Sequence, residues 1–162
     1  ADLLQRQEDL AEHRFAVDSV LEAVEGLVER VAANGTPTVL DLPRLSHLAT
    51  DITGEVTGGA SVLDLVAALH PTAAVAGTPT VAAVDTIRRL EPFDRGRYSG
   101  PVGWVDGRGD GEWAIALRCA RIQEDGSLRA FAGAGIVAGS DPAAELAETE
   151  LKLRSILDVV GA

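Results

Sequence analysis

Residues 130–152 read AFAGAGIVAGSDPAAELAETELK, and this stretch sets the order of secondary structure at the C-terminal end of the chain. The part from Leu128 to Val137 is predicted as a strand. Asp141 and Pro142 then indicate a helix start, because aspartate caps helices and proline fits the first turn. The helix should run to about Val160 with a buried stripe of spaced apolar residues, namely Leu146, Leu153, Ile156, Leu157 and Val160.

Two glycines, Gly133 and Gly135, interrupt the strand pattern. Glycine weakens a strand unless a ligand or another backbone must approach closely. A dinucleotide-binding loop is excluded, because the glycines lie in no βαβ unit and precede no suitable helix. The pattern favours close approach of backbone N–H groups to an anionic molecule.

The segment before this stretch reads as strands and tight turns. Val102 to Val105 and Trp113 to Ile122 alternate apolar and polar residues, and the DGRGDG sequence between them suits a hairpin turn. A second turn, EDG, leads into the strand at Leu128. We therefore expect a three-stranded antiparallel meander.

The first ninety residues supply further helices and strands. Helical spacing of apolar residues predicts one long helix over 2–33, ended by Asn34-Gly35. Strands are expected at 38–42 and 45–57, helices at 62–69 and about 78–90, and a loop between these two helices. The order of elements indicates an α+β fold with antiparallel sheets flanked by helices.

Composition excludes several classes of protein. The chain has 162 residues, 46% of them hydrophobic, and a formal net charge of −11, which argues against a nucleic-acid partner. Its single cysteine, Cys119, permits no internal disulfide and no cysteine cage for a metal. No run is long enough to span a membrane, and the acidic start does not resemble a signal peptide. We expect a soluble cytoplasmic protein without a membrane or nucleic-acid partner.

Acidic residues recur at helical spacing in the first and last helices. Glu145, Glu148 and Lys152 share one face of the last helix, and Asp9 and Glu12 are similarly spaced in the first. One interpretation is a solvated charged face with an ordinary surface ion pair. The other is a set of carboxylates offered to a hard cation such as Mg²⁺, which prefers oxygen ligands.

Three other residues are candidates for binding an organic acid. Arg118 lies in the predicted strand among alanines, so it either lines a cavity, where guanidinium can grip a carboxylate through two hydrogen bonds, or faces solvent. Tyr98 could assist such binding. His47 projects on the same side as Asp51 and Glu55, and its alternatives are a site residue or a structural histidine.

Several strings taken together resemble the chorismate-utilising enzymes. They are EDLAEHRFAVDSV, LSHLATDITGEV, LHPTAAVAGTP, RYSGPVGWVD, ALRCARI and FAGAGIVAGSDPAAELAETELKL, and they cover nearly the whole chain in order. The resemblance implies an α/β/β/α sandwich, of which residues 1–162 supply about one half, the C-terminal portion of a chorismate-binding domain. The N-terminal half is expected to be absent.

The resemblance also implies roles for individual residues. Glu12 and Glu148 match the glutamates that hold Mg²⁺ in the family, with Asp9 and Glu145 as neighbouring acids. The substrate-binding positions that the family motifs imply are His47, Ala74, Tyr98, Arg118, Gly133, Gly135 and Lys152. Arg118 at one end of chorismate and Mg²⁺ at the other would fix the dianion for reaction.

The LHPTAAVAGTP motif, with the small Ala74, resembles the corresponding motif of isochorismate synthases, whereas salicylate synthases tend to carry threonine at this position. The implied reaction adds water at C2 of chorismate and removes the C4 hydroxyl, for menaquinone or siderophore biosynthesis. No residue matches the family's general base, a lysine, or its general acid, a glutamate. The chain alone is therefore expected to be inactive and to pair with the missing half or with itself. The alternatives are a salicylate synthase and a non-catalytic chorismate-binding remnant.

Overall fold

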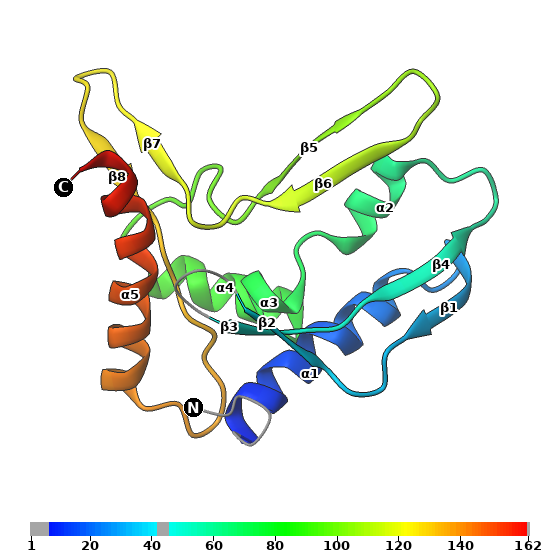
Figure 1. Ribbon diagram of the computed structural model, residues 1–162, viewed down its shortest axis with the longest axis horizontal. Helices are drawn as coiled ribbons and strands as arrows, with labels where there is room; N and C mark the ends of the chain where they lie inside the picture. Colours follow the sequence, from blue (N-terminus) through cyan, green and yellow to red (C-terminus); the bar gives the residue numbers. More distant parts are fainter. Residues whose placement is uncertain (1–6, 42–45, 162) are drawn as a thin grey trace.

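The computed structural model describes residues 7–41 and 46–161, and it is an α+β fold built from helices and short antiparallel hairpins (Figure 1). The described ranges contain five helices and eight strands. The helices are α1 (Gln7–Ala23), α2 (Val62–Leu69), α3 (Ala73–Ala76), α4 (Thr80–Leu90) and α5 (Pro142–Val160). Four strands follow α1, and four more lie between α4 and α5. The fold class predicted from the sequence is confirmed.

The strands form four separate two-stranded antiparallel sheets in the described ranges. β1 (Val28–Ala33) pairs with β4 (Ile52–Val56), and this pair encloses the hairpin of β2 (Thr38–Asp41) and β3 (Ser46–Ala49). β5 (Pro101–Val105) pairs with β6 (Gly111–Ile115). β7 (Ala120–Ile122) pairs with β8 (Leu128–Ala130), and this hairpin lies beside α5 (Figure 1).

Two predicted elements are shorter or divided. The helix predicted over 2–33 ends at Ala23, and the chain turns at Gly26, whose φ of +80° suits glycine, before it enters β1. The strand predicted over 45–57 is divided into β3 and β4. The loop predicted between α2 and α4 contains the short helix α3. The predicted bounds at residues 2–6, 42 and 45 lie outside the described residues.

The predicted three-stranded meander is wrong. The strand expected over 113–122 breaks after Ile115, because Leu117 and Arg118 leave the ladder and Arg118 has a φ of +49°. β5–β6 and β7–β8 are therefore independent hairpins. The strand expected to reach Val137 ends at Ala130, and residues 131–137 continue outside any sheet.

Local signals place the helix starts correctly. Asp141 Oδ1 accepts a hydrogen bond from the Ala144 amide at 2.9 Å, which confirms the predicted cap of α5. Ser61 and Asp64 form the predicted capping box of α2. The buried stripe predicted for α5 is largely wrong, since Ile156 is buried but Leu146, Leu157 and Val160 are exposed.

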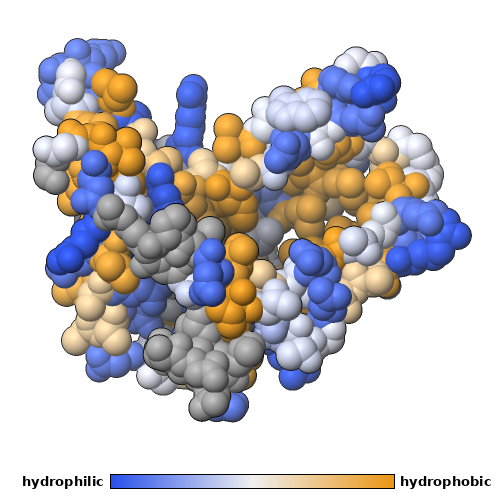
Figure 2. Space-filling model, viewed as in Figure 1, coloured by the Kyte–Doolittle hydropathy of each residue, from blue (hydrophilic) through white to orange (hydrophobic). Residues whose placement is uncertain are grey.

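Few apolar side chains are buried in the described ranges. The buried ones are Val24, Ala76, Phe131 and Ile156, while Trp104 is 55% exposed and Val102 is 56% exposed. Figure 2 shows apolar side chains on the open surface around the β5–β6 hairpin. The described sheets therefore leave apolar faces without a covering layer.

No helix within the described residues is by itself long and apolar enough to cross a membrane. Only α2 taken together with residues 73–90 passes on length and composition, as a pair bent by 41°. The cytoplasmic location expected from the sequence stays a prediction.

The β5–β6 hairpin offers a test of this fold at Gly103. A Cβ at this position would collide with the carbonyl oxygen of Glu112 and come within 2.6 Å of the Trp113 ring. We expect Gly103→Ala to lower the free energy of unfolding by about 1–3 kcal/mol, measured by chemical denaturation.

The matched control is Gly107→Ala in the turn of the same hairpin, where an added Cβ meets no atom within 4 Å. Equal destabilisation by the two substitutions would contradict the described pairing of β5 with β6.

Candidate functional site

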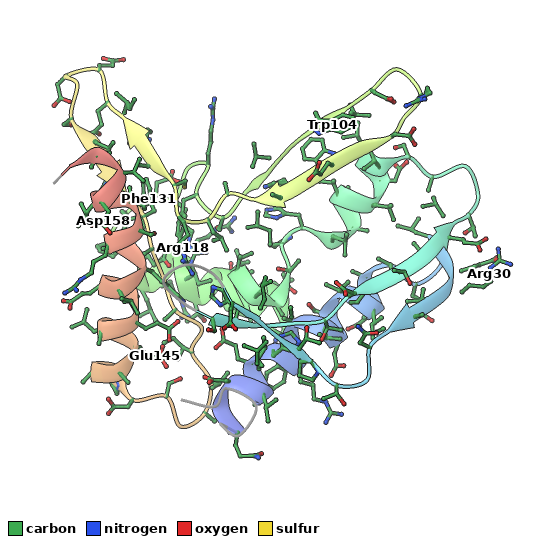
Figure 3. All side chains as sticks on the ribbon, viewed as in Figure 1. Arg30, Trp104, Arg118, Phe131, Glu145 and Asp158 are labelled. Atoms are coloured by element: carbon green, nitrogen blue, oxygen red, sulfur yellow. The ribbon has the colours of Figure 1, made fainter. Side chains whose placement is uncertain are left out.

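Most polar residues predicted from the sequence lie near the inner side of α5. Figure 3 shows Glu145 on this helix and Arg118, from the break between β6 and β7, between α5 and the rest of the chain. The predicted residues come from α1, β3, the break between β6 and β7, residues 131–137, and α5. These segments are far apart in sequence, so the fold itself assembles the site.

Arg118 and His47 meet at the centre of this site. Arg118 Nη2 donates to His47 Nε2 at 3.3 Å. Partial burial lowers the pKa of His47, and the charges of Arg118 and Lys152 lower it further, against an opposing effect of Glu148. A neutral His47 that accepts at Nε2 carries its proton on Nδ1, which leaves that N–H as a donor.

Lys152 connects α5 to the glycine-containing segment. Its Nζ donates to the Gly133 carbonyl at 3.1 Å and forms an ion pair with Glu148 one turn earlier. The Lys152 side chain is only 15% exposed. Of the two interpretations of the charged residues on α5, a solvated surface face therefore does not describe Lys152, whose side chain is largely buried.

Glu12 lies against the same segment from the other side. A Cβ at Gly135 would overlap the Glu12 carboxylate, so glycine permits this close approach. Although much of the Glu12 residue is exposed, partial burial of its carboxylate raises its pKa. Lys152 lowers this pKa, whereas the negative charges of Glu148, Glu145 and Asp9 raise it.

The other three predicted acids thus all act electrostatically on Glu12. Within residues 7–41 and 46–161, however, no three acidic, histidine or cysteine side chains converge tightly enough to hold a metal ion. The donor chemistry fits a hard divalent cation, because every candidate ligand is a carboxylate and positive charge would relieve the repulsion at Glu12.

Tyr98 borders the site through its ring and hydroxyl group. The ring stacks on Phe131 with centroids 5.3 Å apart, and a Cβ at Gly133 would come within 2.9 Å of the Tyr98 hydroxyl. Burial raises the pKa of Tyr98, and nearby Arg95 partly offsets this rise, so the phenol is protonated near neutral pH. It can therefore donate a hydrogen bond to an anion.

Ala74 lies in α3, which packs on α1 through a bond from the Ala73 amide to Ser19 Oγ at 3.4 Å. Among the described residues, no hydrogen bond or ion pair joins Ala74 itself to the other candidates, so its place near the site rests on α3. His13 bonds Thr50 Oγ1 at 2.7 Å and ties α1 to the end of β3.

Sequence reasoning missed Phe131 and the pair formed by Glu91 and Arg95. Phe131 is buried against Tyr98, and Arg95 binds Glu91 through two hydrogen bonds of 2.8 and 2.5 Å. The available signals were an aromatic residue directly before the glycines and an i, i+4 charge pair after α4.

A cavity of about 690 Å³ lies between α3, α4 and residues 91–99, away from the His47–Arg118 contact. None of the predicted site residues lines it. We place the candidate site at the charged cluster, because polar groups of complementary charge from five segments meet there.

Comparison with known proteins gives consistent results. The family model described as "Chorismate binding enzyme" matches residues 1–161. Isochorismate synthase DhbC of Bacillus subtilis is 44% identical over 162 residues, which is 99% of this chain and 40% of that protein. The chain therefore spans about 40% of the length of this curated relative.

Solved structures agree. The crystal structure of a putative 2,3-dihydroxybenzoate-specific isochorismate synthase, DhbC of Bacillus anthracis, matches with a TM-score of 0.94 and 42% identity over 99% of this chain and 43% of that one. MenF, the menaquinone-specific isochorismate synthase of Escherichia coli, matches with a TM-score of 0.83 and 32% identity over 95% of this chain and 35% of that one.

The raised pKa of Glu12 predicts a particular pH dependence of stability. A carboxyl group whose pKa is higher in the folded than in the unfolded state favours folding when protonated. This contribution is complete below the unfolded pKa and is lost as the pH rises through the folded pKa. Without divalent cations at pH 7, we expect Glu12→Gln to raise the melting temperature by roughly 2–4 °C.

The measurement is thermal unfolding with a chelator present at several pH values between 4 and 8. Glu124→Gln, in the exposed β7–β8 turn, makes the same chemical change away from the site and should have no such effect. A lower melting temperature for Glu12→Gln at pH 7 would refute the electrostatic argument.

Proposed function

Because the chain belongs to the family of chorismate binding enzymes, we propose that it supplies the carboxylate-binding and metal-binding part of an isochorismate synthase. The observation that carries this proposal is a pair of cations beside the acids around Glu12. Arg118 bonds His47, Lys152 bonds the Gly133 carbonyl, and the charges of both act on His47. Arg118 would supply positive charge at one end of such a site, and the carboxylates at the other end, where Lys152 pairs with Glu148, would be available to a metal.

The proposed substrate is chorismate, a dianion with two carboxylates. Arg118 would bind the enolpyruvyl carboxylate through its guanidinium group, assisted by the Tyr98 hydroxyl and the backbone at Gly133 and Gly135. His47, neutral and with a proton on Nδ1, would face the ring of the substrate. These groups hold and orient the substrate, so they contribute positioning and charge stabilisation.

The proposed cofactor is Mg²⁺, held by Glu12 and Glu148 with Asp9 and Glu145 as neighbouring acids. When bound, the ion would neutralise and orient the ring carboxylate of chorismate. Carboxylates are suitable ligands for Mg²⁺, which usually keeps water and substrate oxygens among its other ligands.

In the proposed reaction, water adds at C2 of chorismate and the C4 hydroxyl departs, so the product is an isomer of the substrate. A base must take a proton from the water, and an acid must protonate the departing hydroxyl group. We assign both roles to residues outside this chain, which spans about 40% of the length of a curated relative.

The first test of this function compares Arg118→Met with the parent protein, both as the complete gene product that carries this chain. Loss of a charged, two-bond contact to a carboxylate should weaken chorismate binding about 10–100-fold in the presence of Mg²⁺. Calorimetry measures the binding, and chromatography identifies isochorismate as the product.

Arg108→Met is the control, since Arg108 is 81% exposed and its ion partners are Asp106 and Asp110 of the β5–β6 turn. Binding that does not change with Arg118→Met would remove Arg118 from the site. Salicylate as the product would favour the salicylate synthase alternative, and binding without turnover would favour the non-catalytic one.

A partner for the open sheets is part of the proposal. Each described strand has one paired neighbour, and every residue of β5 is exposed. Open strand edges and exposed apolar faces favour pairing with further strands. We propose that the remaining part of a longer enzyme covers these faces, or a second copy when that part is absent.

For the isolated 162-residue chain, we therefore expect association that increases with concentration in light scattering. Trp104→Lys should reduce the association, because Trp104 is exposed on β5. Val159→Lys on α5, where Val159 is 84% exposed but outside any sheet, should not. A monomer at every concentration would contradict self-association.

A further inference from the structure

Arg95 makes contacts with three separate segments of the chain. It pairs with Glu91 through Nε and Nη2, and its Nη1 donates to the Val75 carbonyl at 2.8 Å and to Ser99 Oγ at 3.3 Å. The guanidinium carbon also lies 5.7 Å from the centre of the Tyr98 ring. The hydrogen bonds use all three nitrogen atoms of one guanidinium group.

The pair of Arg95 and Glu91 is shielded from solvent. The two side chains are 25% and 26% exposed, and Glu91 is the C-terminal cap residue of α4. A two-bond pair in such surroundings has a defined geometry, because the planar guanidinium fits the carboxylate in one orientation. Glu91 therefore holds the guanidinium plane against Val75 and Tyr98.

The Val75 contact joins this pair to Ala74, the position at which the family resemblance implies a difference between isochorismate and salicylate synthases. Val75 follows Ala74 directly in α3, and its carbonyl is an acceptor for Arg95. Ser99 Oγ accepts from the same Nη1; Ser99 is buried, and its amide donates to the Ala116 carbonyl at 2.9 Å beyond the end of β6. Arg95 thus ties α3 to the segment that precedes Arg118.

A second neighbour contacts the Tyr98 ring. Phe131 stacks on it at an angle of 17°, and Arg129 lies 5.9 Å from the centre of the Phe131 ring. The Tyr98 ring therefore contacts both Arg95 and Phe131, and its hydroxyl lies close to Gly133. The direction of that hydroxyl depends on both neighbours.

We propose that Arg95, oriented by Glu91, is a positioning residue that directs the Tyr98 hydroxyl toward the bound carboxylate. Through Val75 it also sets the distance between Tyr98 and Ala74. The proposal rests on the proposed function for its substrate, but the geometry of Arg95 and Tyr98 is independent of it. Arg95 does not touch the substrate and acts through Tyr98 and α3.

A double-mutant cycle with Arg95→Lys and Tyr98→Phe tests this role in the complete gene product. Lysine keeps the charge but cannot bond Glu91, Val75 and Ser99 together. We expect Arg95→Lys to raise KM for chorismate about 10-fold with kcat changed less than about 3-fold, since one charge-assisted contact to the substrate is misaligned.

In the Tyr98→Phe background, the hydroxyl is already absent, so Arg95→Lys should add less than about 2-fold to KM. Arg89→Lys is the matched control, because Arg89 on the same helix contacts only Asp85 and Thr86 within the described structure and is exposed. The same increase in KM in both backgrounds, or a loss of melting temperature with unchanged KM, would overturn the proposal.

A second readout does not need chorismate. Tyr98 is the only tyrosine among the 162 residues. Subtracting the spectrum of the Tyr98→Phe variant removes the absorbance of any tyrosine elsewhere in the complete gene product. Arg95 lowers the pKa of Tyr98 and Glu91 raises it, so Arg95→Lys, with a displaced charge, should raise the phenol pKa in a spectroscopic titration.

The two readouts separate the possible failures. A parent protein that does not act on chorismate defeats the proposed function, while a raised phenol pKa in Arg95→Lys would still support the contact of Arg95 with Tyr98. An unchanged phenol pKa in a folded Arg95→Lys variant would overturn the positioning role itself.

Discussion

The site depends on one short segment, residues 131–135, which lies outside the sheets of the described structure. One backbone bond, from the Phe131 amide to the Cys119 carbonyl at 3.1 Å, ties its start to the residue that precedes β7, and side-chain contacts hold the rest. Phe131 anchors it by stacking on Tyr98, Lys152 bonds the Gly133 carbonyl, and Gly135 admits the carboxylate of Glu12. Because side chains from α1 and α5 meet at this backbone, a shift of one residue would take Gly133 away from Lys152 and Gly135 away from Glu12. This constraint accounts for two glycines where a strand would prefer larger residues.

Much of the site was predictable from the sequence, since its residues lie in short motifs whose chemistry is local. The charged face of α5 follows from helical spacing, and the caps at Ser61 and Asp141 follow from side chains that bond the next turn. The meeting of Glu12 with Gly135 is different. No periodicity connects residues so far apart, and only the resemblance to a family placed them in one site.

The errors arose where two patterns share the same apolar residues. Val24, Val28 and Val31 continue a helical spacing, yet Gly26 ends the helix and the latter two enter β1. At Arg118, alternation predicted a continuous strand, but a positive φ breaks the ladder there and sends the guanidinium to His47. The Arg95 contacts could not be predicted for another reason, since two of its partners are the Val75 backbone carbonyl and the Tyr98 ring, which no residue spacing reveals.

The arrangement of strands has a consequence for the rate of folding. Three of the four sheets join strands that follow each other in the chain, and the fourth, β1–β4, only encloses one of these hairpins. Such pairings close short loops and form early, because little chain entropy opposes them. The contacts between α1 and residues 131–152 must close a loop of more than a hundred residues. The charged site should therefore be the last part of the chain to assemble, long after its hairpins.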